Sequence, residues 1–89
     1  MLKEKSFSFG TVNGRLYDFH LQDDILPMHN HGAKDVHITI VARGSFKVRG
    51  FDWERVVTAG DVLDFQPGDT HEFVALENNS RIVNIIKGV

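Results

Sequence analysis

Apolar and polar residues alternate along most of this 89-residue chain, a period of two that is typical of β-strands with unlike faces. The stretch "SFSFGTVNGRLYDFHL" alternates on both sides of Asn13-Gly14, which predicts a tight hairpin turn at this dipeptide. "DVHITIVARGSFKVRG" predicts two more strands joined at Arg43-Gly44. Turn residues separate four further strands, expected in residues 53–60, 61–70, 71–80 and 81–88. No segment has a convincing helical pattern, so the sequence predicts an all-β protein of about eight short antiparallel strands, a sandwich or small barrel.

The length predicts a single domain over residues 1–89, with residues 1–5 as a segment that could be frayed. A chain of this size buries only about 60–65% of the surface that its unfolded form exposes, which leaves a small margin of stability. A bound metal ion or a second subunit would add to that margin.

Both faces of the strand "HITIV" carry apolar residues. Ile38 and Ile40 lie on one face, and His37, Thr39 and Val41 lie on the other. If the histidine face looks into the barrel, the isoleucines need a cover, which could be a second sheet of the same chain or a second subunit. Because so little chain is available to cover them, we favour a homodimer.

Composition excludes several classes of function. The 10 basic and 12 acidic residues give a net charge of −2 and form no basic stripe, so we expect no binding to nucleic acid. The chain has no cysteine, which excludes disulfides, thiolate nucleophiles and zinc–cysteine clusters. Neither a signal-peptide core nor a run of about 18 apolar residues is present, so we expect no membrane span, and a cytoplasmic location is the default.

Histidines are concentrated in "LPMHNHGAKDVHITIVARG", which contains His29, His31 and His37. Residues i and i+2 of a strand point to the same face about 6.5–7 Å apart, so His29 and His31 could bind one metal ion; alternatively, both are solvated loop residues. A turn centred on Gly32 would bring the strand of His37 back beside His31. Alternatively, His37 is a single hydrogen-bonded polar residue inside the barrel.

Two further histidines differ in their surroundings. His71 opens a strand after Pro67-Gly68 and shares a face with Phe73 and Ala75. His20 follows "LYDF" and has no partner in the pattern, so an exposed position at a strand end is expected. Weaker candidates for the lining of a cavity are Tyr17, Asp64 and Gln66.

The segments "HNHGAKDVHITIVARG" and "GDVLDFQPGDTH" resemble the two motifs of the cupin family, over roughly residues 26–73. The first segment has the paired histidines and the closing glycine of its motif, and His37 stands where the family usually has glutamate. Asp35 also has a suitable spacing and is a rival for that carboxylate position. The second segment keeps the spacing from its first glycine to His71, although Pro67 is one place late. The resemblance implies a double-stranded β-helix, the jelly-roll barrel of the cupins.

The resemblance also implies that His29, His31 and His71 ligate a divalent transition metal ion, with His37 as the fourth ligand. Iron, nickel, copper, manganese and zinc are the candidates. Four neutral imidazoles leave the full charge of the ion uncompensated, which favours a small anionic ligand. The family's chemistry implies a metal-dependent enzyme, such as a dioxygenase, isomerase or decarboxylase, that acts on a small metabolite. The alternatives are a non-catalytic module that binds a small ligand or a metal, and a structural role for the histidines.

Overall fold

The computed structural model describes residues 2–29, 35–65 and 69–88, which form nine β-strands. The prediction of an all-β fold is confirmed. The described residues contain nine strands, whereas the sequence predicted about eight. The strands are β1 (Leu2–Phe9), β2 (Val12–Phe19), β3 (Ile25–His29), β4 (Asp35–Arg43), β5 (Ser45–Arg49), β6 (Glu54–Thr58), β7 (Val62–Phe65), β8 (His71–Ala75) and β9 (Ser80–Gly88).

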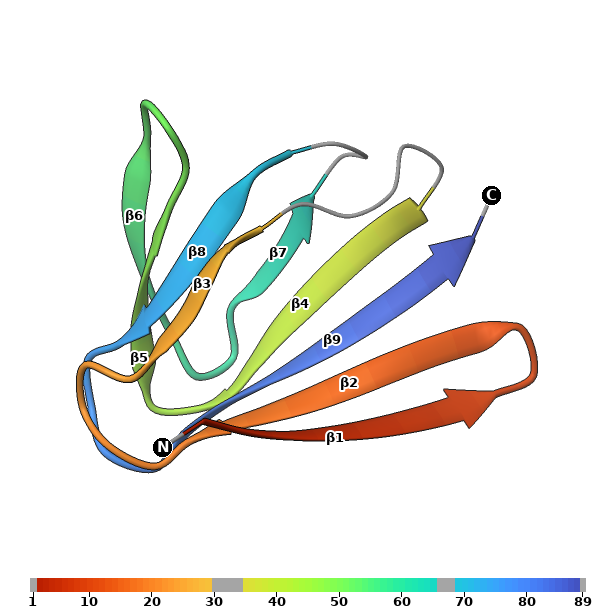
Figure 1. The fold of residues 1–89 in the computed structure, drawn as a ribbon, viewed down its shortest axis with the longest axis horizontal. Coiled ribbons are helices and arrows are strands. Elements are labelled where there is room, and N and C mark those ends of the chain that lie inside the picture. Colours follow the sequence, from red (N-terminus) through yellow and green to blue (C-terminus); the bar gives the residue numbers. More distant parts are fainter. Residues whose placement is uncertain (1, 30–34, 66–68, 89) are drawn as a thin grey trace.

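The strands form two antiparallel sheets that face each other (Figure 1). The larger sheet has the order β1-β2-β9-β4-β7, and the smaller sheet has the order β3-β8-β5-β6. The chain crosses from one sheet to the other between β2 and β3, between β3 and β4, and again after β4, β6, β7 and β8. Most neighbouring strands are therefore far apart in the sequence, as expected for a jelly roll.

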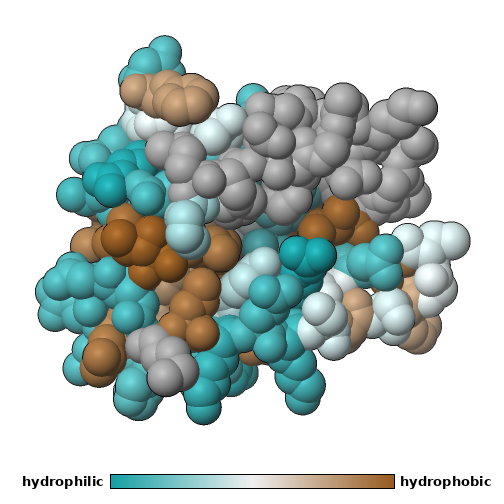
Figure 2. Space-filling view, in the orientation of Figure 1, coloured by the Kyte–Doolittle hydropathy of each residue, from teal (hydrophilic) through white to brown (hydrophobic). Residues whose placement is uncertain are grey.

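The core lies between the sheets and is built from the inward-facing residue of each alternating pair. Three phenylalanines with no exposed surface occupy its centre. Phe46 on β5 meets Phe19 on β2 with ring centres 4.8 Å apart and Phe73 on β8 with ring centres 6.0 Å apart, both edge to face. The contact between Phe46 and Phe19 joins the two sheets, and the contact with Phe73 lies within the smaller sheet. On the surface drawn in Figure 2, by contrast, hydrophobic residues form separate patches between hydrophilic ones.

The predicted faces of β4 are confirmed. His37, Thr39 and Val41 are buried, whereas Ile38 is exposed on the opposite face and Ile40 is partly exposed. The predicted turn at Gly44 is confirmed as well, since this glycine has a φ of 80° between β4 and β5.

The predicted turn at Asn13-Gly14 is wrong. Phe9 pairs with Val12, so the turn falls on Gly10-Thr11, and Gly10 has the positive φ of 59° that a two-residue hairpin loop requires. Asn13 and Gly14 lie inside β2 instead. The ring of Phe7 covers Gly14 so closely that a Cβ there would lie 2.0 Å from the ring. Residues 2–5 are paired with β2 rather than frayed.

No helix long and apolar enough to span a membrane occurs in residues 2–29, 35–65 and 69–88.

Candidate metal centre

Two of the four predicted ligands have described side chains, and both lie in the interior. His37 is on β4 of the larger sheet and His71 is on β8 of the smaller sheet. Their exposed fractions are 1% and 0%, and their ring centres are 5.6 Å apart. The structure therefore brings together two imidazoles that are 34 positions apart in the sequence (71 − 37).

The prediction that the strands before and after Gly32 pair with each other is wrong. β3 pairs with β8 in the smaller sheet, and β4 pairs with β7 and β9 in the larger one. The two strands that carry the histidine-rich segment thus lie in different sheets. His37 faces His71 across the interior, and His31 lies outside the described residues.

An aromatic wall supports the two imidazoles. Phe65 is directly opposite His37 on β7, and its ring stacks on His71 with centres 3.8 Å apart and an interplanar angle of 12°. Phe73 meets the edge of His71 at 5.9 Å. Phe65 was not among the predicted site residues, although its alternation with Leu63 in "VLDF" places both residues on the inward face. The wall fixes the plane of His71 and shields it from water.

A backbone carbonyl lies beside one ring nitrogen of His71. Its Nδ1 lies 3.2 Å from the carbonyl oxygen of Asp69. A neutral imidazole that donates from Nδ1 to a carbonyl keeps its lone pair on Nε2, and this arrangement is common among histidines that ligate metals.

The remaining candidates are placed only through the backbone. His29 ends β3 directly opposite His71, and Asp35 begins β4 opposite Gly88, but neither side chain belongs to the described part of the structure. Within that part, no three His, Asp or Glu side chains form a group that could hold a metal ion.

The two described imidazoles fit one shared transition metal ion. With about 2.1 Å between an ion and each ligating nitrogen, two ring centres on one ion lie roughly 4.5–6.5 Å apart, depending on the angle at the ion. The observed 5.6 Å falls within this range. Nitrogen donors in a buried, aromatic setting suit zinc, iron, nickel or copper better than magnesium or calcium.

Next to His37 the interior of the larger sheet is polar. The following cross-strand row contains Arg15, Asn84 and Thr39, with Leu63 of β7 beside Thr39. The hydroxyl of Thr39 donates to Oδ1 of Asn84 at 2.8 Å, and both residues are buried. Arg15 is half exposed at the end of this row, and a hydrogen bond with Tyr17 contributes most to raising the pKa of its guanidinium. The guanidinium of Arg15 beside the polar row forms an ion pair with Glu4 at 3.7 Å.

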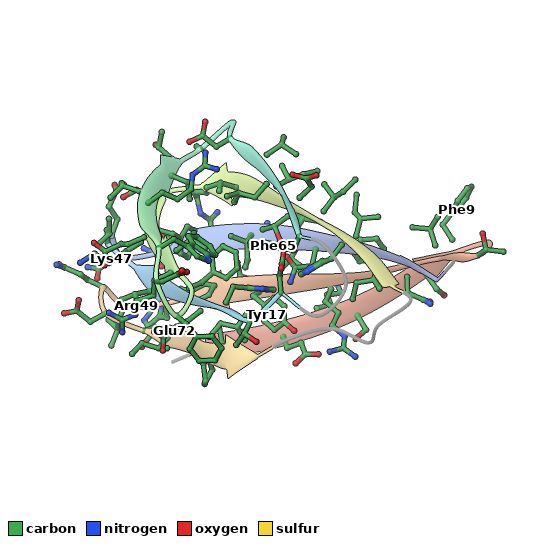
Figure 3. All side chains as sticks on the ribbon, turned by 90° about the horizontal axis from the view of Figure 1, so that it is seen from above. Phe9, Tyr17, Lys47, Arg49, Phe65 and Glu72 are labelled. Carbon is green, nitrogen blue, oxygen red and sulfur yellow. The ribbon has the colours of Figure 1, made fainter. Side chains whose placement is uncertain are left out.

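Of the weaker cavity candidates, Tyr17 is buried on the inward face of β2. Figure 3 shows Tyr17 and Phe65 between the sheets, with Phe9 far away at the tip of the β1–β2 hairpin. Asp64 is exposed on the outer face of β7, so its assignment to the cavity is wrong, and Gln66 lies outside the described residues. His20 is exposed at the end of β2, as predicted.

Comparison with known proteins gives structural matches only; no family model and no curated protein matches the sequence. KdgF from Halomonas sp. superimposes with a TM-score of 0.86 at 20% identity, over 99% of this chain and 79% of that one. An RmlC-like cupin protein from Desulfovibrio desulfuricans gives a TM-score of 0.85 at 17% identity, over 97% and 81% of the two chains. A Cupin 2 conserved barrel domain protein from Salinispora arenicola gives 0.80 at 18% identity, over 96% and 74%. The chain therefore has the fold of a small cupin domain.

Proposed function

We propose that this protein binds one divalent transition metal ion through His29, His31, His37 and His71, and that it acts on a small anionic metabolite at this ion. The observation that carries the proposal is the buried pair of His37 and His71, with ring centres 5.6 Å apart on facing sheets. His29 is included because its backbone pairs with His71. His31 is included from the sequence motif.

The residues of this chain define what the site would accept. His37 and His71 would hold the ion, and Phe65 and Phe73 would exclude water on one side of it. When bound, a divalent ion polarises a coordinated oxygen of the ligand as a Lewis acid. An anionic ligand is favoured because neutral imidazoles leave the charge of the ion uncompensated. Arg15, which forms an ion pair with Glu4 at 3.7 Å, is a further cation on this side.

A pocket on the β1–β2 hairpin supports an approach of the ligand from the side of Arg15. It has a volume of about 330 Å³ and is lined by Ser6, Phe7, Ser8, Asn13, Gly14 and Arg15. Asn13 pairs with Ile86, which in turn pairs with His37, so this pocket borders the row of the candidate metal centre. Its hydroxyl, amide and guanidinium groups suit a carboxylate-bearing metabolite.

Elemental analysis of untagged protein, purified without chelators, tests metal binding. We expect about one equivalent of a transition metal in the wild type and in His20→Ala, whose exposed histidine is a matched control. His37→Ala and His71→Ala should lose the metal. If the wild type holds no metal and takes up none when iron, nickel, copper, manganese and zinc are supplied, the proposal is wrong.

We also propose that the outer face of the larger sheet is the surface through which two copies of the chain form a homodimer. Phe7 and Val62 on this face are 44% and 61% exposed, and Ile38 lies between them. Both outer faces carry ion pairs. Those of Asp18 with Arg81 and Arg43 lie at one end of the larger sheet, whereas Lys47–Glu54 and Arg49–Glu72 lie on the smaller sheet, where Val56 is 64% exposed. Figure 3 places Lys47, Arg49 and Glu72 on that side of the molecule.

The size of the larger sheet is sufficient for a stable contact. Five strands about 4.8 Å apart, with about seven residues each at about 3.3 Å per residue, make a face on the order of 500 Å² before side-chain relief is added. Standard interfaces bury about 800 Å² of accessible surface on each partner, which is of the same order. The chain has a mass of 10.1 kDa. Sedimentation equilibrium should therefore give twice this mass, and a monomer at all concentrations would contradict the dimer.

A cytoplasmic location stays a prediction from the sequence, and fractionation of cells that produce the protein would test it.

A further inference from the structure

A second pocket lies away from the histidine pair, where β2 ends and β9 begins. It has a volume of about 370 Å³, within the range of small-ligand sites. Its lining residues are Lys3, Asp18, Phe19, His20, Arg43 and Asn79. None of these residues belongs to the candidate metal centre.

Charged side chains form one cross-strand row at this pocket. Lys3 on β1 pairs with Asp18 on β2, Asp18 pairs with Arg81 on β9, and Arg81 pairs with Arg43 on β4. Three cations therefore surround a single carboxylate, which leaves an excess charge of about +2 (3 − 1) across four adjacent strands. We call this set the cationic row.

The carboxylate of Asp18 is already engaged by two members of the row. Arg81 donates to it from Nε at 2.6 Å and from one terminal nitrogen at 3.1 Å. A terminal nitrogen of Arg43 lies 3.6 Å from the same carboxylate. The hydrogen bonds from Arg81 contribute most to lowering the pKa of Asp18, and the charges of Arg81, Arg43 and Lys3 add to the effect. All three cations thus act on one acid, and one acid does not neutralise them.

A β-bulge is responsible for the place of Arg43 in the row. Val41 pairs with Ile82, but after an irregularity in the register it is Arg43, not Ala42, that stands opposite Arg81. Without the bulge, the alternation of β4 would put Arg43 on the inward face with Val41. Bulges of this kind re-aim a side chain, often beside a functional site. The Nε of Arg43 then donates to the carbonyl of Asn79 at 2.6 Å, which holds the guanidinium at the pocket.

One pairing within the row is repulsive, and the single carboxylate of Asp18 does not fully offset it. Like charges directly opposite each other on neighbouring strands destabilise the pairing, and here Arg43 opposes Arg81. An added anion between the cations would relieve this repulsion. A phosphate monoester carries about −1.5 to −2 charges at pH 7, which matches the excess of the row, and guanidinium groups bind its oxygens with good geometry.

We propose that this pocket binds a phosphate group, with Arg43 and Lys3 as its principal contacts and His20 at its wall. The volume of the pocket leaves room for an organic remainder, so a small phosphorylated metabolite fits better than inorganic phosphate alone. This site is separate from the proposed metal centre, and neither depends on the other.

Amide chemical shifts of the isotope-labelled full chain test the proposal. The protein is titrated at constant pH and ionic strength with inorganic phosphate and, separately, with a hexose monophosphate, and sulfate and chloride serve as reference anions. We expect saturating shifts at residues 18–20 and 79, at lower concentration for the hexose monophosphate than for phosphate. Equal affinity for the two would identify free phosphate as the ligand class and still support the site.

Variants separate a built site from general attraction of anions. Arg43→Gln should weaken binding by about tenfold or more, because it removes a charged hydrogen-bond donor. Lys3→Gln tests the same pocket if Arg43→Gln does not fold. Lys47→Gln removes the same charge from the other sheet and should bind as the wild type does.

Three results would overturn the proposal. Shifts of equal size with all four anions would indicate an adventitious ion only. Unchanged binding in both Arg43→Gln and Lys3→Gln would place the anion elsewhere. The third result combines two observations: phosphate causes no saturating shifts in the wild type, and Arg43→Gln changes the sedimentation mass. Together they would assign the cationic row to the contact between subunits.

Discussion

Replacement of His71 by phenylalanine separates the packing role of this ring from its proposed role as a metal ligand. The imidazole has no exposed surface and stacks on Phe65 with ring centres 3.8 Å apart. A phenyl ring can keep this stacking and the edge contact with Phe73, but it has no nitrogen to offer. Because phenylalanine is larger than histidine, we expect an overpacking cost of about 1–3 kcal/mol in the metal-free protein.

The effect of metal on thermal stability then reports ligation alone. At a free metal concentration of about 100 times Kd, binding to the folded state adds about 2.7 kcal/mol to the free energy of unfolding. In a domain of this size about 1 kcal/mol corresponds to about 4–8 °C, so the wild-type Tm should rise by roughly 10–20 °C. His71→Phe should show a rise near zero at the same metal concentration.

Differential scanning calorimetry of chelator-treated protein, with zinc and nickel ions added in separate runs, measures both quantities. His20→Phe is the matched control, because His20 is exposed and lies at the end of β2, and it should keep the full wild-type rise. The same metal-dependent rise in Tm in His71→Phe and in the wild type would show that His71 is not a metal ligand.

Three further changes test other parts of the structure. Asp18→Asn should lower the free energy of unfolding at pH 7; because the folded-state pKa of Asp18 is lowered, its contribution exists above the unfolded-state pKa of about 3.9 and is lost as pH falls through the folded-state value. Urea titrations should therefore show the difference from the wild type shrinking in acid, and a difference that grows would contradict the assignment. Thr39→Val removes the buried donor to Asn84 and should cost about 1–3 kcal/mol by urea denaturation at neutral pH, whereas a neutral effect would mean that Asn84 finds another partner. Ile38→Asp should convert the proposed dimer to a monomer in sedimentation experiments, whereas Val56→Asp, exposed on the smaller sheet, should not; equal behaviour of the two variants would count against the proposed face.

The alternation of the sequence was sufficient to predict the class of fold and much of its core. In β4, the sequence separates His37, Thr39 and Val41 from Ile38 and Ile40, and the structure buries the first set as expected. The same local pattern predicts that His71, Phe73 and Ala75 share the buried face of β8. Such predictions succeed because the side-chain period of a strand is a property of the local backbone.

Other features depend on contacts between distant parts of the chain. Asn13-Gly14 has a strong preference for a turn, but the pairing of Phe7 with Gly14 and of Phe9 with Val12 moves the turn to Gly10-Thr11. In the observed register residues 12–19 pair with β9 on their other side, and the ring of Phe7 covers Gly14; these contacts outweigh the local preference.

The sequence by itself determined the strands, their inward faces and the choice of histidines as candidates, because alternation and residue chemistry are local. Only the tertiary structure decided that β3 and β4 enter different sheets, so that His37 meets His71 across the interior with Phe65 stacked beside them. It also decided that a bulge in β4 places Arg43 opposite Arg81 in the cationic row. Sheet partners and register are set by packing over the whole barrel, and no short stretch of sequence encodes them.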